Sequence, residues 1–282
     1  MFKDISEVSI FSMTEEEFAN WRQKEGASTI FHQGRYWEKL RPGFYQPIHL
    51  IASLTAKQAT RPTLFCWGFR SALSESDVEF TNGSIPVHLL TDIQNYDLES
   101  LSSNRRNHVR RSRKRAEIVE LIDPLLLQEQ GYEVLVSALT RGSYKAVPSK
   151  DEYIASISNY IIPKRRLILA GLIEGKLGGY IEAHAVEGTA YIQSVYVATE
   201  ALSTYIGTGL VFDFVQVCRR SGKIHQIVYG QHSREDEALC VFKDGMRFPV
   251  KHIPAKVQIN PVMENFIRWR TPDSYYRLSG RD

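Results

Sequence analysis

The stretch from residue 166 to residue 198 constrains the fold most strongly, because it reads as three consecutive strands. Its sequence, RLILAGLIEGKLGGYIEAHAVEGTAYIQSVYVA, is rich in apolar and aromatic residues and is broken twice, at Glu174-Gly175 and at Glu187-Gly188. An acidic residue followed by glycine favours a tight hairpin turn. The stretch therefore predicts an antiparallel meander.

The meander begins a longer alternation of strands and helices. We expect a helix that starts at the glycine pair Gly207 and Gly209, a strand over 224–230, a helix over 234–245 and a strand in PVKHIPAKVQI. Upstream, residues 28–90 read as strand-rich, with PIHLIASL and TLFCWGF as the β-rich runs. Residues 96–121 predict a helix, or a loop followed by a helix, that ends in the strand-like EIVEL, and residues 122–165 read as helical. The order β-β-β-α-β-α-β in the C-terminal half predicts an α+β fold.

Composition limits the class of protein. The chain has 282 residues, 43% of them hydrophobic, which is enough for two ordinary cores, and its formal charge of +3 is too small to identify a nucleic-acid binder. Cys66, Cys218 and Cys240 have no CxxC spacing, which argues against disulfides and a zinc site, so no metal is expected. The N-terminus is acidic rather than apolar, and no segment resembles a membrane span. These features predict a cytoplasmic protein.

Gly207 and Gly209 need an explanation, because glycine inside a helix costs about 1 kcal/mol against alanine. A Rossmann fingerprint would need a third glycine at Phe212, and a Walker A loop would need a lysine and a hydroxyl residue where Leu210 and Val211 stand. Two explanations remain open. Either bare first-turn amides bind a phosphate, aided by the helix dipole, or the glycines admit a close neighbouring backbone.

The residues around this pair, AYIQSVYVATEALSTYIGTGL, resemble the GNAT superfamily of acyltransferases. In that family a strand, a Gln/Arg-x-x-Gly-x-Gly/Ala loop and a helix bind the pyrophosphate of acyl-coenzyme A. LCVFKDGMRF is similar to the aromatic and Gly-Phe ending of the family, and the resemblance covers residues 166–256. It implies acyl-CoA, with an acetyl or longer group, as the donor. The donor-binding residues that it implies are Tyr196, Val197, Thr204, Gly207, Thr208 and Gly209.

Two positions depart from the GNAT pattern. Thr204 stands where Gln or Arg is usual, which weakens one side-chain contact to phosphate. Lys243 stands where many members carry a tyrosine that reprotonates the leaving thiolate. A lysine after phenylalanine is instead similar to the Fem-type aminoacyl transferases, which have two GNAT-like halves and take the aminoacyl group from tRNA. This second resemblance implies two GNAT-like lobes with a mixed, mostly antiparallel sheet: a degenerate lobe over 1–115 and an acyltransferase lobe over 116–282.

A strongly basic run separates the two expected lobes. Seven of the eleven residues from Arg105 to Arg115 are Arg or Lys, with Val109 as the apolar member. On a helix these charges would cover most of the circumference, so we expect no buried face. The run is either a solvated surface or a phosphate-binding ridge. A ridge would take tRNA, a carrier protein, a nucleotide-linked or lipid-linked substrate, or the phosphates of the donor.

Strand alternation places polar side chains together in the meander. It puts Tyr180, Glu182 and His184 on one face of their strand. The neighbouring strand is expected to present Tyr191, Gln193, Val195 and Val197 on one face. Glu182 is a candidate catalytic base that deprotonates an ammonium through water, and the alternative is a solvent-facing carboxylate.

Two further catalytic candidates lie outside the meander. His232 follows a strand end, where α/β sheets place sites, and is otherwise part of a capped turn before the next helix. Lys243 would stabilise an oxyanion or bind a phosphate, and its alternative is an ordinary surface lysine.

The sequence thus predicts an N-acyltransferase that moves an acyl group from acyl-CoA directly to an amine acceptor, either a small molecule or a peptide. Fem-type transfer from aminoacyl-tRNA is the alternative enzyme. A non-catalytic GNAT-like module that binds an anionic partner through Arg105–Arg115 is the alternative outside catalysis.

Overall fold

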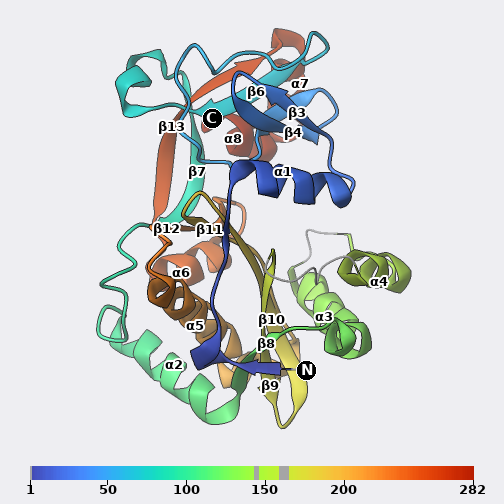
Figure 1. The fold of residues 1–282 in the computed structure, drawn as a ribbon, viewed down its shortest axis with the longest axis vertical. Coiled ribbons are helices and arrows are strands. Elements are labelled where there is room, and N and C mark those ends of the chain that lie inside the picture. The colour runs from blue at the N-terminus through green and yellow to red at the C-terminus, as the bar shows by residue number, and fades with distance from the viewer. Residues whose placement is uncertain (1, 143–145, 159–164) are drawn as a thin grey trace. The chain divides into compact units, whose positions relative to one another are not determined.

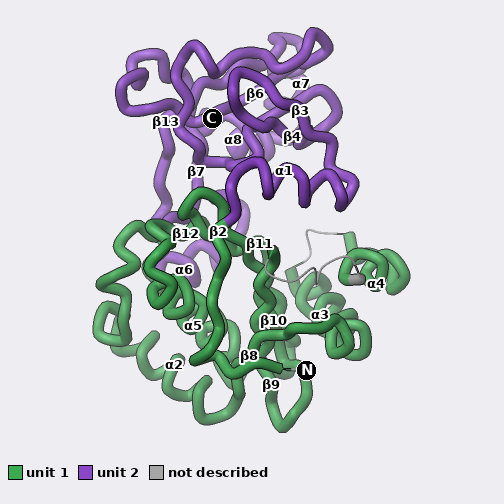
Figure 2. The backbone as a smooth tube through the Cα atoms, viewed as in Figure 1, with its two compact units in different colours: residues 1–12, 90–229, 245–248 green, residues 13–89, 230–244, 249–282 purple. Residues whose placement is uncertain are grey.

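The computed structural model describes residues 2–142, 146–158 and 165–282 and divides into two compact units (Figure 2). Unit 1 comprises residues 1–12, 90–229 and 245–248, and unit 2 comprises residues 13–89, 230–244 and 249–282. The expected boundary between residues 115 and 116 falls inside unit 1, because residues 90–115 fold together with the meander. The assignment of one GNAT-like lobe to each half of the chain stays a prediction.

Unit 1 is built on strands in the order β1-β8-β9-β10-β11-β12. Neighbours are antiparallel except β11 and β12, which are parallel. The strands are β1 (Phe2–Asp4), β8 (Glu117–Leu121), β9 (Leu167–Ile173), β10 (Lys176–Val186), β11 (Thr189–Val197) and β12 (Gln226–Gln231). The helical elements are η1 (Ile5–Glu7), α2 (Ser103–Arg115), η3 (Leu127–Gly131), α3 (Tyr132–Gly142), α4 (Lys150–Ser158), η4 (Thr199–Thr204) and α5 (Ile206–Ser221).

The predicted meander is confirmed as β9, β10 and β11. Both of its turns carry positive φ at two successive residues, 50° and 79° at Glu174 and Gly175 and 48° and 76° at Glu187 and Gly188. Such angles belong to the hairpin turn whose twist matches the strands, and glycine adopts them without strain. The local turn chemistry therefore sets the register of the strand pairs next to each turn.

Helices cover both faces of the unit 1 sheet. On one face Ile206 of α5 packs against Gly171 of β9, and Figure 1 shows α2 beside α5. On the other face Tyr153 of α4 contacts Tyr180 of β10. Residues 122–165 are largely helical as expected, although residues 143–145 and 159–164 lie outside the described part of the chain. No helix among the described residues has the length and apolarity that a membrane span requires.

Unit 2 holds the strands β7-β13-β6-β5-β4-β3 in that order, antiparallel except for the parallel pair β5 and β6. The short β2 (Ser12–Met13) spans the boundary between the units. The strands are β3 (Thr29–His32), β4 (Arg35–Arg41), β5 (Phe44–Pro47), β6 (Gly68–Ala72), β7 (Gly83–Leu90) and β13 (Val250–Ile259). The helical elements are α1 (Glu15–Lys24), η2 (Glu75–Phe80), α6 (Glu237–Gly245), α7 (Pro261–Arg270) and α8 (Pro272–Ser279).

Successive residues of β5 face two different cores. Phe44 packs with Ile267 of α7 and with Leu278 of α8, whereas Tyr45 packs with Trp37. The expected strands in PIHLIASL and TLFCWGF are wrong, because the first run holds only the last residue of β5 and the second only the first two of β6. The large mixed, mostly antiparallel sheet and the C-terminal order of elements are confirmed.

Candidate functional site

β11 parts from β12 halfway along its length. The two strands pair only from Thr189 with Gln226 to Tyr191 with Val228, and β11 then continues to Val197 with no further β12 pairing among the described strands. A bulge accompanies the divergence, since Ser194 pairs with Glu182 of β10 whereas Ile192 pairs with the next residue. A bulge bends its strand and is common beside active sites. One edge of the last part of β11 is therefore open to a ligand.

The first turn of α5 follows this open edge. Tyr205 precedes the helix with a left-handed φ of 60°, and no side chain of the described residues caps the helix. The amides of Thr208 and Gly209 donate to the Tyr205 carbonyl at 2.9 and 3.2 Å, whereas those of Ile206 and Gly207 have no partner among the described residues. Unpaired amides at a helix start, together with the dipole, favour a negative charge. This turn can therefore hold one phosphate.

The two glycines of α5 have different surroundings. A Cβ on Gly209 would lie 2.2 Å from Ser112 Oγ and 3.2 Å from Ile118 Cδ1, so α2 packs here at a distance that only glycine permits. Among the described residues, a Cβ on Gly207 would meet only Val197 Cγ2, at 3.2 Å. Close packing thus accounts for Gly209. The predicted phosphate contacts of both glycines stay predictions, with Gly207 the better placed.

Basic side chains of α2 lie beside the start of α5. Arg111 donates to the Tyr205 hydroxyl at 3.4 Å with its guanidinium 5.7 Å from the ring centre, and Arg115 donates to the Ser203 carbonyl at 2.9 Å. His108 stacks on the Tyr205 ring, with the two ring centres 4.0 Å apart. Guanidinium groups and unpaired amides therefore lie close together at the start of α5.

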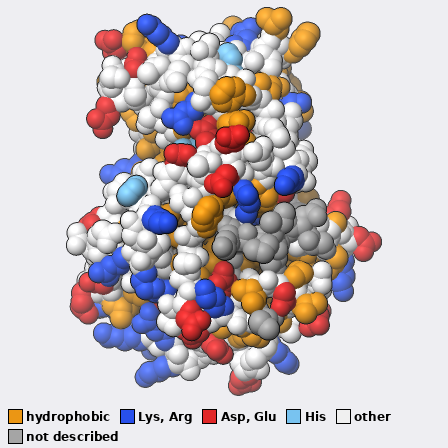
Figure 3. All heavy atoms as spheres, viewed as in Figure 1, with side chains coloured by type: hydrophobic (Ala, Val, Ile, Leu, Met, Phe, Trp, Pro, Cys, Tyr) orange, Lys and Arg blue, Asp and Glu red, His pale blue; other side chains and the backbone are white. Residues whose placement is uncertain are grey.

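The expectation that α2 buries no face is wrong. Val109 and Ser112 are fully buried, because a narrow stripe of two small side chains suffices where the facing helix carries glycine. Arg113 pairs with the buried Asp213 at 2.8 Å, and burial raises the pKa of that carboxyl. Lys114, like its neighbour Arg110, has no hydrogen-bond or ion-pair partner in the described part of the chain. Figure 3 shows Lys and Arg side chains gathered over the region where Figure 1 draws α2.

The side chain of Thr204 binds its own turn, as Thr204 Oγ1 donates to the Ala201 carbonyl at 2.6 Å. Its predicted role in donor binding stays a prediction. A cation that the sequence did not single out reaches the same loop. Arg141 of α3 donates to Thr199 Oγ1 at 2.9 Å and to the Val197 carbonyl at 3.0 Å. Because α3 precedes the loop by more than fifty residues, no local pattern could have revealed this arginine.

Glu182 lies in a buried group of tyrosines. Its side chain is 4% exposed, and the neighbouring pair Tyr180 and Tyr196 bring their ring centres to 5.2 Å. The hydroxyls of Tyr153 and Tyr180 lie 3.3 Å apart. Burial raises the pKa of Tyr153 to about 12 and also raises the pKa of Tyr196, so both remain O–H donors at neutral pH. The site thus combines a carboxylate with phenols, and Tyr153 was missed by the sequence reasoning.

The bulge in β11 overturns the expected face of that strand. Tyr191 stacks on His184 at 5.2 Å, on the face that carries Glu182, whereas Val197 pairs with Gly179 and lies on the opposite face. Gln193 is the extra residue of the bulge and is exposed. Strict alternation therefore fails after Ile192, and Ser194 rather than Gln193 pairs with Glu182.

The other two catalytic candidates belong to unit 2, whereas Glu182 belongs to unit 1. His232 Nδ1 lies 2.7 Å from the Tyr276 hydroxyl, and its backbone N–H donates to the Pro86 carbonyl at 3.0 Å. Burial, followed by the nearby positive charges, lowers the pKa of His232, which keeps the ring neutral at pH 7. Lys243 of α6 is 5% exposed and is not the ordinary surface lysine of the alternative reading. Their catalytic roles stay predictions.

Comparisons with known proteins show what the fold is similar to. No protein-family model matches the sequence, and no curated protein matches it either. Among solved structures, FemX has a TM-score of 0.61 at 8% identity, with 91% of this chain and 99% of that chain covered. The C-terminal domain of a putative lysylphosphatidylglycerol synthetase from Agrobacterium fabrum has a TM-score of 0.59 at 12% identity, with 93% and 92% covered. L-PGS from Bacillus licheniformis has a TM-score of 0.54 at 12% identity, with 98% and 100% covered. The chain therefore shares the fold of FemX and of these two lysylphosphatidylglycerol synthetase structures.

Proposed function

We propose that this chain is a transferase that moves an acyl group from acyl-CoA to an amine. The observation that carries the proposal is the divergence of β11 from β12 directly before a helix whose first two amides are unpaired. A strand edge suits a thioester carbonyl and its carrier, and helix amides suit the phosphates at the far end of that carrier.

Each group of the unit 1 site has a task in this reaction. The amides of Ile206 and Gly207 and the guanidinium of Arg111 bind the donor phosphates, and the backbone of Tyr196 and Val197 holds the carbonyl. The acceptor amine attacks the carbonyl carbon directly, and its proton passes to Glu182. The sulfur leaves with the bonding electron pair and is then protonated. No covalent enzyme intermediate is formed.

Calorimetric titration with acetyl-CoA tests donor binding, and two neighbouring arginines provide matched variants. Arg111→Ala removes the cation beside the α5 start, so the dissociation constant should rise by about 10- to 100-fold, the value of a charge-assisted contact. Arg110→Ala removes the same charge from the same helix but not from the α5 start, and should change it by less than about threefold. Failure of the wild-type chain to bind, or equal losses in both variants, would contradict the acyl-CoA proposal.

Transfer from aminoacyl-tRNA is a second candidate, favoured by α2. Arg110 and Lys114 extend the basic surface beyond the α5 start, and a donor much larger than CoA would contact them. The Fem-type resemblance of the sequence implies this donor, and the likeness to FemX over almost the whole of both chains agrees with that resemblance in fold. Filter binding of aminoacyl-tRNA at several salt concentrations separates the two donors. Removing one phosphate-binding cation lowers the steepness of log affinity against log salt concentration by about 0.7 to 0.9. A tRNA donor predicts that both arginine variants lower the slope, whereas a CoA donor predicts no tRNA binding at moderate salt.

A further inference from the structure

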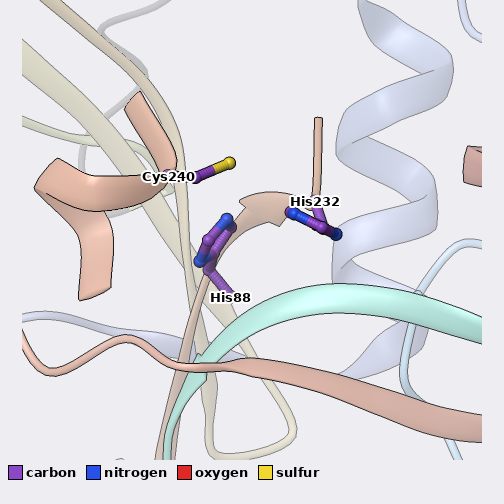
Figure 4. A group of neighbouring side chains, drawn as sticks. All are labelled: His88, His232 and Cys240. Atoms are coloured by element: carbon purple, nitrogen blue, oxygen red, sulfur yellow. The ribbon is translucent and has the colours of Figure 1, made fainter. Parts of the chain in front are cut away.

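Unit 2 brings together three side chains that bind transition metals. His88 stands on β7, His232 follows β12, and Cys240 stands on α6 (Figure 4). Each offers one ligand atom, and these three atoms all lie within 4.8 Å of one another. The ring centres of His88 and His232 are 5.5 Å apart in an edge-to-face arrangement.

The spacing suits one tetrahedral ion. Zinc bonds of about 2.0 Å to nitrogen and about 2.3 Å to sulfur place neighbouring ligand atoms roughly 3.3 to 3.6 Å apart at tetrahedral angles. Small side-chain rotations bring atoms within 4.8 Å to that separation. His88 is fully buried, whereas His232 and Cys240 are partly exposed, so an ion can enter from solvent.

Neighbouring groups fix the orientation of the His232 ring, as the hydrogen-bond partners of metal-binding histidines do. The Tyr276 hydroxyl lies 2.7 Å from Nδ1, and when it accepts the proton of that nitrogen, Nε2 keeps a lone pair for a metal. The Arg234 guanidinium lies 4.5 Å from the centre of the Tyr276 ring and packs on it. The Pro86 carbonyl, two residues before His88 on β7, accepts the backbone N–H of His232 at 3.0 Å. The same strand thus positions two of the three ligands.

We propose that unit 2 binds one zinc-class divalent ion through His88, His232 and Cys240. Imidazole and thiolate ligands favour Zn²⁺ and Co²⁺ over Mg²⁺ and Ca²⁺, which prefer oxygen. Three protein ligands leave a fourth position for water or a substrate group, as in sites that act on a bound molecule rather than only holding the fold. The cationic side chain of Lys243 follows one turn after Cys240. It limits the affinity for the metal, because the thiolate offsets only part of the charge of the ion and the rest is repelled by the lysine.

Cobalt spectroscopy on the full chain tests the site without an activity assay. After treatment with a chelator and a phosphine reductant, titration with Co²⁺ should give a thiolate-to-cobalt charge-transfer band and the strong visible bands of a four-coordinate ion, saturating at one equivalent. Zn²⁺ should abolish both. Absence of these bands in the wild-type chain would overturn the proposal.

Two serine variants identify the ligand. Cys240→Ser should remove the charge-transfer band and weaken Zn²⁺ binding by at least about 10-fold. Cys66→Ser is the matched control, because Cys66 is a cysteine of the same unit whose thiol donates instead to the Gly68 carbonyl at 2.9 Å, and it should keep the band. Tryptophan fluorescence checks that each variant is folded. An unchanged cobalt spectrum in folded Cys240→Ser, or its loss in folded Cys66→Ser, would refute the assignment.

Discussion

Gly209→Ala is expected to destabilise the chain, although it replaces glycine by the best helix former inside a helix. The added Cβ would lie 2.2 Å from Ser112 Oγ and 2.9 Å from Ser112 Cβ. The hydroxyl can rotate away, but the Cβ of a fully buried serine cannot move unless α2 moves with it. The close approach of the two helices therefore outweighs the propensity of alanine.

The magnitude follows from two opposing terms. Overpacking of this kind costs about 1 to 3 kcal/mol, and the clash with Ser112 Cβ places Gly209→Ala in the upper half of that range. The helix propensity of alanine returns about 1 kcal/mol. The net loss should be about 1 to 2 kcal/mol, which lowers Tm by about 2 to 8 °C in a chain of this size. Gly207→Ala is the matched control, because its Cβ meets one methyl group at 3.2 Å and stability should change by less than about 1 kcal/mol.

The assay must report on unit 1. All four tryptophans lie in unit 2, so their fluorescence does not follow α5. Thermal melts by far-UV circular dichroism and hydrogen exchange of the α5 amides do follow it. Ser112→Gly removes both clashing atoms, so the double variant should be about 1 kcal/mol more stable than the sum of the single changes predicts. If Gly209→Ala proved as stable as the wild type, the packing account of this glycine would be refuted.

Three further predictions test other parts of the structure. Arg113→Ala should cost about 1 to 3 kcal/mol at neutral pH, because Asp213 is 6% exposed and loses a partner at 2.8 Å. Burial raises the pKa of Asp213, so the folded chain binds more protons than the unfolded one as the pH falls toward the ordinary carboxyl value of 3.8. The loss of stability caused by Arg113→Ala should therefore be smaller at low pH. Thermal melts at about pH 8 and about pH 5 would show this difference. Gln46→Leu should cost about 2 to 3 kcal/mol of stability, because Gln46 Oε1 accepts two hydrogen bonds at 3.1 and 2.7 Å from the buried Arg70. Arg70→Met should cost less, because it removes the buried charge together with these hydrogen bonds. Urea unfolding followed through tryptophan fluorescence measures both. Glu182→Gln should lower kcat by about 10²- to 10⁴-fold without weakening donor binding, and an unchanged kcat would exclude Glu182 as the base.

The parts of the fold that the sequence predicts are those that local chemistry determines. The hairpin turns after β9 and β10 need positive φ, and the glycine in each turn indicates this in the sequence. The basic helix ends where EIVEL begins, as expected, because the β-branched Ile118 and Val119 favour an extended chain. The order of elements around α5 could therefore be predicted without any knowledge of long-range contacts.

The N-terminal strands show where apolar content misleads. Ile48, Ile51 and Leu54 of PIHLIASL are all buried, yet the run is mostly turns and loops outside the sheet. Burial needs apolar side chains in any backbone conformation, so an apolar run of this length predicts a core position more reliably than a strand. The alternation in β11 failed for a different reason, since one unpaired residue at Gln193 reverses every face after it.

The metal-ligand cluster shows why the cysteine rule gave the opposite expectation. Rules based on CxxC spacing detect sites whose ligands share a short loop, and by that rule Cys240 has no partner. The structure instead brings Cys240 of α6 close to His88 of β7, and the second ligand, His232, precedes Cys240 by only eight positions. A histidine ligand carries no spacing signature of its own when the strand that bears it is distant in sequence. The absence of a cysteine pair therefore excludes a zinc ribbon or finger, but it does not exclude an ion held by one thiolate and two imidazoles from three different elements.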